Sequence, residues 1–287
     1  MSNLPVLSDY LKRQVFVAFD TETTGMWAPI NRLVELAAVK FTLEDGPIET
    51  FQSLINPLRP VPEEVIEIHG ITDEMVAGSP TADRVLSDFL GFCGPESILI
   101  AHNAPFDISF VGTELDRSKL TFGENPILDT VDIYHRFFPG LPSYSLLNLV
   151  RHFRISDSQA HRALSDAEFV YRLVANAAHK FADLPDSSAL MKTLTVYKMT
   201  DWESEKAELP DNFADLQLAI NTDGRVMIDY DHPVKPSTNR IIHPQQVFRL
   251  GSVYYINAFC EKAKAARTFR LDRIKRYRIV QDSEGND

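Results

Sequence analysis

The chain has 287 residues, of which 44% are hydrophobic and 24% charged, and its formal net charge is −11. This length accommodates one large domain or two ordinary ones, and the composition is typical of a globular protein. Apolar runs stay below the roughly 18 residues of a membrane helix and the N-terminus lacks a secretion signal, so we predict a cytoplasmic protein with no membrane partner. Because Cys93 and Cys260 are far apart, we predict neither a disulfide framework nor a structural zinc site.

The first 180 residues alternate strand-like and helix-like segments. Short apolar runs predict strands, and apolar residues at helical spacing predict amphipathic helices. The predicted strands are 15–20, 33–42, 50–55, 97–101 and 126–131, and the predicted helices are 82–92, 105–115, 145–153 and 163–178. Consecutive strands followed by β–α alternation favour an α/β fold with a mixed sheet flanked by helices.

The composition changes over residues 183–211, which are rich in proline, serine and acids and predict a linker. Beyond it, residues 213–220 predict a short helix, and residues 225–230, 252–259 and 267–274 predict strands. We therefore expect a first domain over residues 1–182 and a small β-rich domain over residues 212–282.

Charge is also divided between these regions. Residues 235–278 contain eleven lysines or arginines and only two acids, a local balance of +9 that leaves −20 for the rest of the chain. An overall negative charge argues against nucleic acid as a partner, whereas a basic second domain argues for it. A basic segment is also typical of an ordinary solvated surface.

Two carboxylates, Asp20 and Glu22, end the first apolar run in the sequence VFVAFDTETTG. Residues two apart on a strand share a face, with Cα atoms roughly 6–7 Å apart, and their carboxylates repel unless a cation lies between them. Two cations about 3.5–4 Å apart suit phosphodiester hydrolysis, and oxygen ligands favour Mg²⁺ or Mn²⁺. Taken alone, such a pair is more often a solvent-facing strand end.

Three further residues suit the same chemistry. Asp107 is expected in the first turn of a helix, where a carboxylate is favoured by the helix dipole or can serve as a ligand. His161 and Asp166 are about 140° apart on a helix and cannot share a face of it. We therefore predict His161 in the preceding loop as a general base and Asp166 on the helix as a ligand, although a lone histidine is more often structural.

The ordered segments FDTETTG, HNAPFD and HRALSD resemble the DEDDh exonuclease superfamily, which contains polymerase proofreading subunits. The resemblance covers about residues 13–178 and includes NPLRPVPEEVIEIHGIT and ILDTVDIYHRFFPGLPSYSLLNL. It implies a ribonuclease-H-like fold and a 3′→5′ exonuclease that releases nucleoside 5′-monophosphates from DNA or RNA. It also implies that two Mg²⁺ or Mn²⁺ ions are held by four acids and that His161 is the base. The four acids are Asp20, Glu22, Asp107 and Asp166.

The same resemblance implies a set of substrate-binding residues: Thr23, Thr24, Gly25, Met26, His69, His102, Asn103 and Phe106. Phe106 can stack on a base or belong to the core beneath its helix. The expected partners are 3′ ends of single-stranded DNA or RNA, with a polymerase or repair complex as a further partner. The alternative is a non-catalytic nucleic-acid-binding or adaptor protein of such a complex, and the complete set of five site residues favours the enzyme.

The segment IHPQQVFRLGSVYYINAFCEKAKAARTFRLDRI resembles the WYL domain over about residues 213–280. The resemblance implies a small Sm-like or SH3-like β-fold that binds nucleic acid or regulates. On the predicted strand 267–274, Phe269 and Leu271 are expected to face the core and Arg270 to point outward. The arginines can instead pair with acids of the first domain. The predicted nucleic-acid contacts are Tyr254, which stands where the family has tryptophan, Tyr255, Arg267, Arg270 and Arg273.

Overall fold

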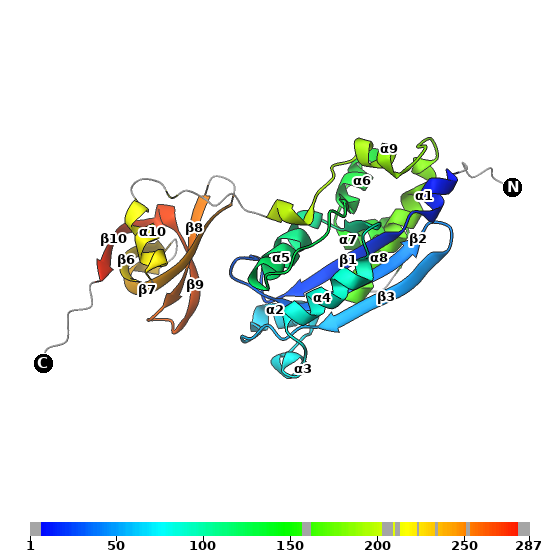
Figure 1. The fold of residues 1–287 in the computed structure, drawn as a ribbon. Helices are drawn as coiled ribbons and strands as arrows, with labels where there is room; N and C mark the ends of the chain where they lie inside the picture. Colours follow the sequence, from blue (N-terminus) through cyan, green and yellow to red (C-terminus); the bar gives the residue numbers. More distant parts are fainter. Residues whose placement is uncertain are drawn as a thin grey trace, which may run out of the picture. The chain divides into compact units, whose positions relative to one another are not determined.

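The structure is a computed structural model that describes residues 7–156, 162–202, 209, 213–222, 224–232, 235–250 and 253–280. The chain divides into two compact units, Met1–Trp202 and Glu203–Asp287 (Figure 1). In the described ranges, no helix has both the length and the apolar character that a membrane span requires.

A five-stranded sheet forms the centre of the first unit, with the strand order β3-β2-β1-β4-β5. The first three strands are antiparallel, and the last two run parallel to β1. Their bounds are β1 Phe16–Thr23, β2 Leu33–Thr42, β3 Gly46–Leu54, β4 Ile98–Ala101 and β5 Ile127–Asp129. This mixed sheet with helices around it confirms the predicted fold class.

Helices cover both faces of the sheet, because side chains alternate along β1. Phe16 and Ala18 belong to one apolar core and Val17 and Phe19 to another. The first core includes α6 (Thr130–Phe137), α7 (Leu146–His152) and α8 (Ala163–Ala177). The second includes α4 (Ala82–Cys93) and α5 (Ala104–Arg117), which cross the near side of the sheet in Figure 1. Helices α5 and α8 therefore reach β1 from opposite faces.

Short helices in the first unit escaped prediction from the sequence. They are α1 (Asp9–Arg13), α2 (Glu63–His69), α3 (Asp73–Val76), α6 and α9 (Ser187–Thr193). The predicted strand 126–131 ends at Asp129, whose side chain accepts a hydrogen bond from the backbone N–H of Val131 at 2.8 Å and so begins α6. That N-cap explains why a strand-like run turns directly into a helix.

Residues 183–202 differ from the predicted linker, because they are ordered on the first unit. They form α9 and a 3₁₀ helix, η2 (Met199–Trp202), and they bury Leu190, Leu194 and Met199. Trp202 packs against Gly112 of α5 so closely that an added Cβ there would lie 2.0 Å from the indole ring. The sequence did not predict this packing, because the proline, serine and acidic residues of the segment predicted a linker and its buried apolar residues are few.

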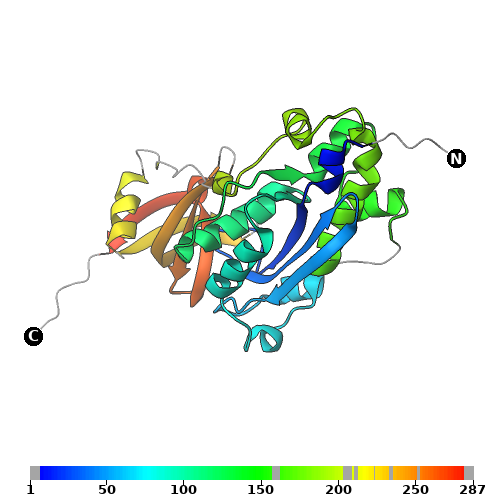
Figure 2. The ribbon, with the colours of Figure 1, turned by 45° about the vertical axis from the view of Figure 1, so that its right-hand side comes forward.

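The second unit is an antiparallel sheet of five strands with a helix packed on it (Figure 2). The strand order is β10-β6-β7-β8-β9, and α10 (Ala214–Asn221) contributes Leu216 and Ala219 to the core. The strands are β6 Arg225–His232, β7 Lys235–Leu250, β8 Val253–Cys260, β9 Ala265–Arg270 and β10 Ile274–Val280. The expected β-rich second region is confirmed.

The prediction of a single strand over residues 267–274 is wrong. Strand β9 ends at Arg270, a 3₁₀ turn occupies Leu271–Arg273, and β10 begins at Ile274. Phe269 and Leu271 are buried as predicted, with exposed fractions of 3% and 2%. The turn breaks the strand alternation beyond Arg270, so that alternation does not explain the burial of Leu271.

Candidate active site

The site lies at the end of β1, which extends beyond its shorter neighbour β4. The pairing between these parallel strands ends at Ala18 and Ile100, so Asp20 and Glu22 lie beyond the part of β1 that pairs with β4. Both follow Phe16 and Ala18 on the face of β1 that α8 covers. The open end of the strand gives the two carboxylates room to meet groups from the helices.

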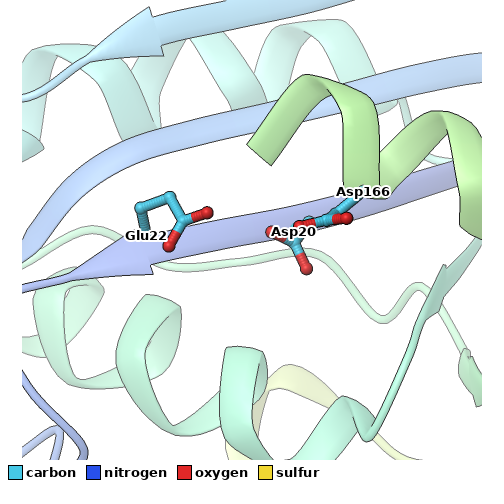
Figure 3. Close-up of side chains that lie close together, drawn as sticks. All are labelled: Asp20, Glu22 and Asp166. Atoms are coloured by element: carbon cyan, nitrogen blue, oxygen red, sulfur yellow. The ribbon is translucent and has the colours of Figure 1, made fainter. Parts of the chain in front are cut away.

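Three carboxylates converge at this place. One oxygen each from Asp20, Glu22 and Asp166 lies within 4.8 Å of the others, and we call these residues the carboxylate cluster. Figure 3 shows Asp166 reaching from α8 toward Asp20, with Glu22 further along β1. The Oδ1 atom of Asp166 is buried and, among the described residues, has no hydrogen-bond partner.

Asp107 approaches from the opposite layer. It is the fourth residue of α5, in the first turn as predicted, and is buried with an exposed fraction of 2%. The hydroxyl of Thr21 donates a hydrogen bond of 2.7 Å to Asp107 Oδ1. The charge of Asp107 also raises the pKa of Asp20, so the two carboxyl groups interact. Asp107 thus borders the cluster rather than sharing its tight set of oxygens.

Burial, with repulsion from neighbouring carboxylates, raises the pKa of all four acids and so disfavours their charged forms. Burial raises the pKa of Glu22 to about 8, with a further contribution from the charge of Asp166. Burial likewise raises the pKa of Asp166 to about 7 and that of Asp107 to about 7. The pKa of Asp20 lies well above its usual range, through burial and then the charges of Asp107 and Asp166. A cation among these groups would reverse the shifts, because it favours the charged form.

The residues present fit a divalent cation. The donors are carboxylate oxygens, which hard ions such as Mg²⁺ and Mn²⁺ prefer, and the orphaned Oδ1 of Asp166 is a buried acceptor in need of a partner. A buried polar group without a partner costs free energy that coordination would offset. Electrostatics and donor chemistry therefore agree on a cation site.

The loop after Glu22 is held by its own side chains. Thr23 Oγ1 donates to the carbonyl of Gly25 at 2.7 Å, and Thr24 Oγ1 accepts the backbone N–H of Arg32 at 3.0 Å. Gly25 has φ 152°, and a Cβ there would lie 2.8 Å from Asn31 Oδ1, so this position requires glycine. Met26 is 67% exposed. Of these four predicted substrate-binding residues, Met26 presents its side chain to solvent.

His69 contacts the backbone of this loop. It is buried at the end of α2, with Nε2 3.3 Å from the carbonyl of Thr23, while Nδ1 accepts the backbone N–H of Ile71 at 3.0 Å. With Nδ1 as the acceptor, Nε2 carries the proton and donates. Burial lowers the pKa of His69, which suits this neutral ring. These contacts place His69 next to Thr23, and its role in substrate binding stays a prediction.

A second loop carries His102, Asn103 and Phe106. Asp129 accepts the backbone N–H groups of Asn103 at 2.9 Å and Ala104 at 3.2 Å, and Asn103 adopts a left-handed φ of 62°. His102 Nδ1 lies 2.8 Å from Thr130 Oγ1, and burial lowers its pKa to about 4. Phe106 packs partly against the core and Phe110. Asp129 fixes the loop and was missed, because it lies more than 20 residues from its partners.

Another unpredicted acid lies beside the carboxylate cluster. Glu35 of β2 is the register partner of Glu22 and is fully buried. Its carboxylate binds the guanidinium of Arg162, immediately before α8. The predicted base, His161, lies outside the described residues, and Asp166 lies on the helix as expected.

The predicted contacts of the second unit are in unlike settings. Arg270 forms two hydrogen bonds with Asp272, Nε–Oδ1 at 3.0 Å and Nη2–Oδ2 at 2.7 Å. Tyr254 packs partly against the core, Arg267 is exposed, and Tyr255 and Arg273 are half-buried. Arg270 therefore has an acid partner within its own unit, which neither sequence interpretation anticipated.

Comparison with known families decides the assignment of the first unit. The family model RNase_T, described as exonuclease, matches residues 17–174, and the model of the WYL domain matches residues 211–279. The chain belongs to the RNase_T exonuclease family. Its first unit is a hydrolytic exonuclease domain, and both resemblances seen in the sequence are confirmed.

Similar proteins include bacterial DNA polymerases. DNA polymerase III PolC-type of Halalkalibacterium halodurans is 38% identical over 170 residues, which are 58% of this chain and 12% of the relative. The protein of the same description from Bacillus subtilis (strain 168) is 35% identical over 176 residues, 59% of this chain and 12% of the relative. The chain thus spans about an eighth of the length of these relatives.

Solved structures share the fold of the first unit. The nuclease domain of 3′hExo, a DEDDh family member bound to rAMP, matches with a TM-score of 0.55 at 16% identity. The match covers 67% of this chain and 98% of that one. At this level of identity the likeness shows the ribonuclease-H-like fold that the sequence predicted.

Proposed function

We propose that this protein is a 3′→5′ exonuclease that hydrolyses the terminal phosphodiester bond of single-stranded DNA or RNA and releases nucleoside 5′-monophosphates. The convergence of Asp20, Glu22 and Asp166 within 4.8 Å carries this proposal. The polarity is supported by family membership and by a fold relative described as a 3′-exonuclease (TM-score 0.54, 18% identity, 64% of this chain and 65% of that one).

The four acids would hold two ions, Mg²⁺ or Mn²⁺, with Asp20 central because it interacts with Asp107, Asp166 and Glu22. When bound, the ions stabilise the charge that develops on the scissile phosphate. His161 takes a proton from the attacking water, whose oxygen bonds to phosphorus. The bond from phosphorus to the 3′ oxygen of the preceding nucleotide breaks, and that oxygen takes up a proton.

The loop of Thr23 to Met26 and the loop of His102 to Phe106 would receive the terminal nucleotide. Exposed Met26 offers an apolar contact for a base, and Phe106 offers an aromatic edge at the start of α5. Base–aromatic stacking is worth roughly 1–3 kcal/mol and tolerates any sequence. A site of this kind would recognise the 3′ end of a strand and not its base sequence.

For the second unit, we propose a supporting contact with the nucleic-acid strand. The positive balance of its segment 235–278 and the exposed arginines of β10 suit phosphate binding. The PolC-type relatives are polymerases, so a polymerase or repair complex is the proposed setting.

The test is hydrolysis of a single-stranded oligonucleotide labelled at either end. With Mn²⁺ or Mg²⁺, the 3′ label should leave first as a 5′-mononucleotide, and the 5′-labelled strand should shorten stepwise. Asp20→Ala should fold and lose orders of magnitude in rate. His161→Ala should lose less, within the roughly 10²–10⁴-fold that base catalysis contributes.

Asp88→Ala is the matched control, since this exposed acid pairs with Arg84 on α4 away from the cluster. Its rate should equal that of the unaltered protein. Hydrolysis that survives a chelator, or near-normal turnover of Asp20→Ala, would refute the proposed function.

A further inference from the structure

An ion pair between the fully buried Glu35 and the partly exposed Arg162 adjoins the carboxylate cluster without belonging to it. Glu35 accepts hydrogen bonds from Arg162 Nε at 3.0 Å and Nη2 at 2.6 Å. It also accepts the backbone N–H of Ala163 at 3.0 Å and Gln52 Nε2 at 2.9 Å. Four donors thus occupy both oxygens of Glu35. Unlike Asp166, this acid is fully satisfied by the protein and is not free to serve as a ligand.

The pair of Glu35 and Arg162 connects the start of α8 to strand β2 of the sheet. Arg162 is the N-cap residue of α8 and Ala163 its first residue, and the first N–H groups of a helix need partners outside it. Glu35 supplies that partner from β2, directly across from Glu22 on β1. Asp166 follows one turn later, and its N–H donates to the carbonyl of Arg162 at 3.1 Å. The position of Asp166 therefore depends on a short chain of bonds from Glu35.

The pair also balances charge beside the cluster. Glu35 raises the pKa of Asp20, Glu22 and Asp166, whereas Arg162 lowers that of Glu22. Without Arg162, Glu35 would be a buried, uncompensated negative charge next to three carboxylates. Because Glu35 and Arg162 neutralise each other, the uncompensated negative charge of this region lies on the carboxylate cluster.

We propose that Glu35 and Arg162 are positioning residues of the exonuclease site, which fix the start of α8 against β2 so that Asp166 meets Asp20 and Glu22 at the spacing that binds cations. This inference rests on the proposed function of the cluster. The competing explanation is a pair that stabilises the fold and leaves the cluster unaffected.

The discriminating variant is Arg162→Lys, which keeps the positive charge and loses the two-pronged geometry of the guanidinium. Mn²⁺ binding to the full chain, followed by electron paramagnetic resonance without nucleic acid, should weaken by roughly 10–100-fold, the usual effect of losing a group that orients metal ligands. The kcat should fall by a similar factor, and KM for the oligonucleotide should stay within about twofold.

The matched control is Arg172→Ala, which breaks an exposed pair with Glu168 further along the same helix. Its Mn²⁺ affinity and kcat should equal those of the unaltered protein. Glu35→Gln keeps the side-chain shape, loses the charge, and should weaken Mn²⁺ binding in the same direction as Arg162→Lys. It therefore decides the matter if Arg162→Lys does not fold.

Normal Mn²⁺ affinity and kcat in a folded Arg162→Lys or Glu35→Gln protein, with only a lower Tm, would overturn the inference and leave the pair a stabilising element. If the unaltered protein binds Mn²⁺ but cleaves no strand, the proposed function fails, and the Mn²⁺ titrations still judge the positioning role.

Discussion

Four acids of the first unit lie in surroundings that penalise their charge. Asp20, Glu22, Asp107 and Asp166 all have a raised pKa, with burial as the leading cause in each case. Such clusters are common at functional sites, where the protein is organised around a ligand and not around its own stability. The cost should be visible when the ligand ion is removed.

We expect the metal-free protein to lose stability as pH rises. Each of these acids has a folded pKa above its unfolded value, so the folded state binds more protons, and this stability is lost as pH passes through the folded values of about 7 and 8. With a chelator, Tm should fall by roughly 5 °C or more between about pH 5 and pH 9, since ~1 kcal/mol shifts Tm by about 2–4 °C in a unit of this size.

Scanning calorimetry across this pH range, with and without Mn²⁺, is the measurement. Mn²⁺ should reduce the fall, because it favours the charged carboxylates. Asp166→Asn should flatten the chelator curve, since one titrating group and its repulsion are removed. A chelator-treated protein whose stability rises over the same range would contradict the assignment of these pKa shifts.

Sequence spacing revealed some of these residues and concealed others. Strand alternation places Asp20 and Glu22 on one face, but the ordered set of motifs, and the family resemblance it carries, is what predicted them and Asp166 as one site. Glu35 and Asp129 could not be predicted, since their importance comes from partners far along the chain: Glu35 meets Arg162, and Asp129 meets Asn103. A buried acid in a strand has no local pattern that announces such a partner.

Among the elements, the loop between β1 and β2 is held from α5. Arg117 donates from Nη2 to the carbonyls of Ala28 at 3.3 Å and Pro29 at 2.8 Å, and from Nη1 to that of Asn31 at 3.2 Å. Buried Glu114 fixes Arg117 by an ion pair of 2.9 Å. This clamp holds the loop that presents Met26.

Arg117→Ala should therefore impair substrate binding more than chemistry. We expect KM for the oligonucleotide to rise about tenfold, equivalent to ~1.4 kcal/mol, with kcat reduced much less, because the loop loses three of its carbonyl contacts while the acids stay in place. Steady-state kinetics on the 3′-labelled strand will measure both constants. Arg84→Ala on α4 is the control, and an effect confined to kcat would exclude the clamp.

Element prediction succeeded where periodicity was long and failed where tertiary context overrode it. The bounds of β2 were predicted to the residue, and α4 and α8 to within one. Strand β7 was missed, because proline argues against an interior strand. The structure accommodates Pro244 next to a register shift between Pro244 and Gln246, where the regular ladder is interrupted.

At the scale of the whole molecule, an acidic enzyme unit is joined to a unit whose basic residues gather in one segment, residues 235–278. The sequence predicted this basic segment, but it did not predict which of the arginines lie beside an acid and which do not. Arg270 is compensated by Asp272, two residues away. Arg276 and Arg278 of β10 are exposed, and within the described part of the chain neither forms an ion pair. Two residues apart on a strand, they share one face and form a pair of cations available to phosphates.

The salt dependence of binding should report this pair. In an Asp20→Ala background, where the strand is bound without cleavage, Arg276→Gln combined with Arg278→Gln should weaken binding of a labelled single strand. It should also reduce the slope of log K against log salt by about 1.4, since each lost contact removes ~0.7 for single strands. Fluorescence anisotropy between about 50 and 200 mM salt covers the useful range. Arg270→Gln is the matched control and should change the slope little, because its guanidinium is engaged by Asp272. An unchanged slope in the double variant with a reduced slope in Arg270→Gln would place the strand at the end of β9 instead.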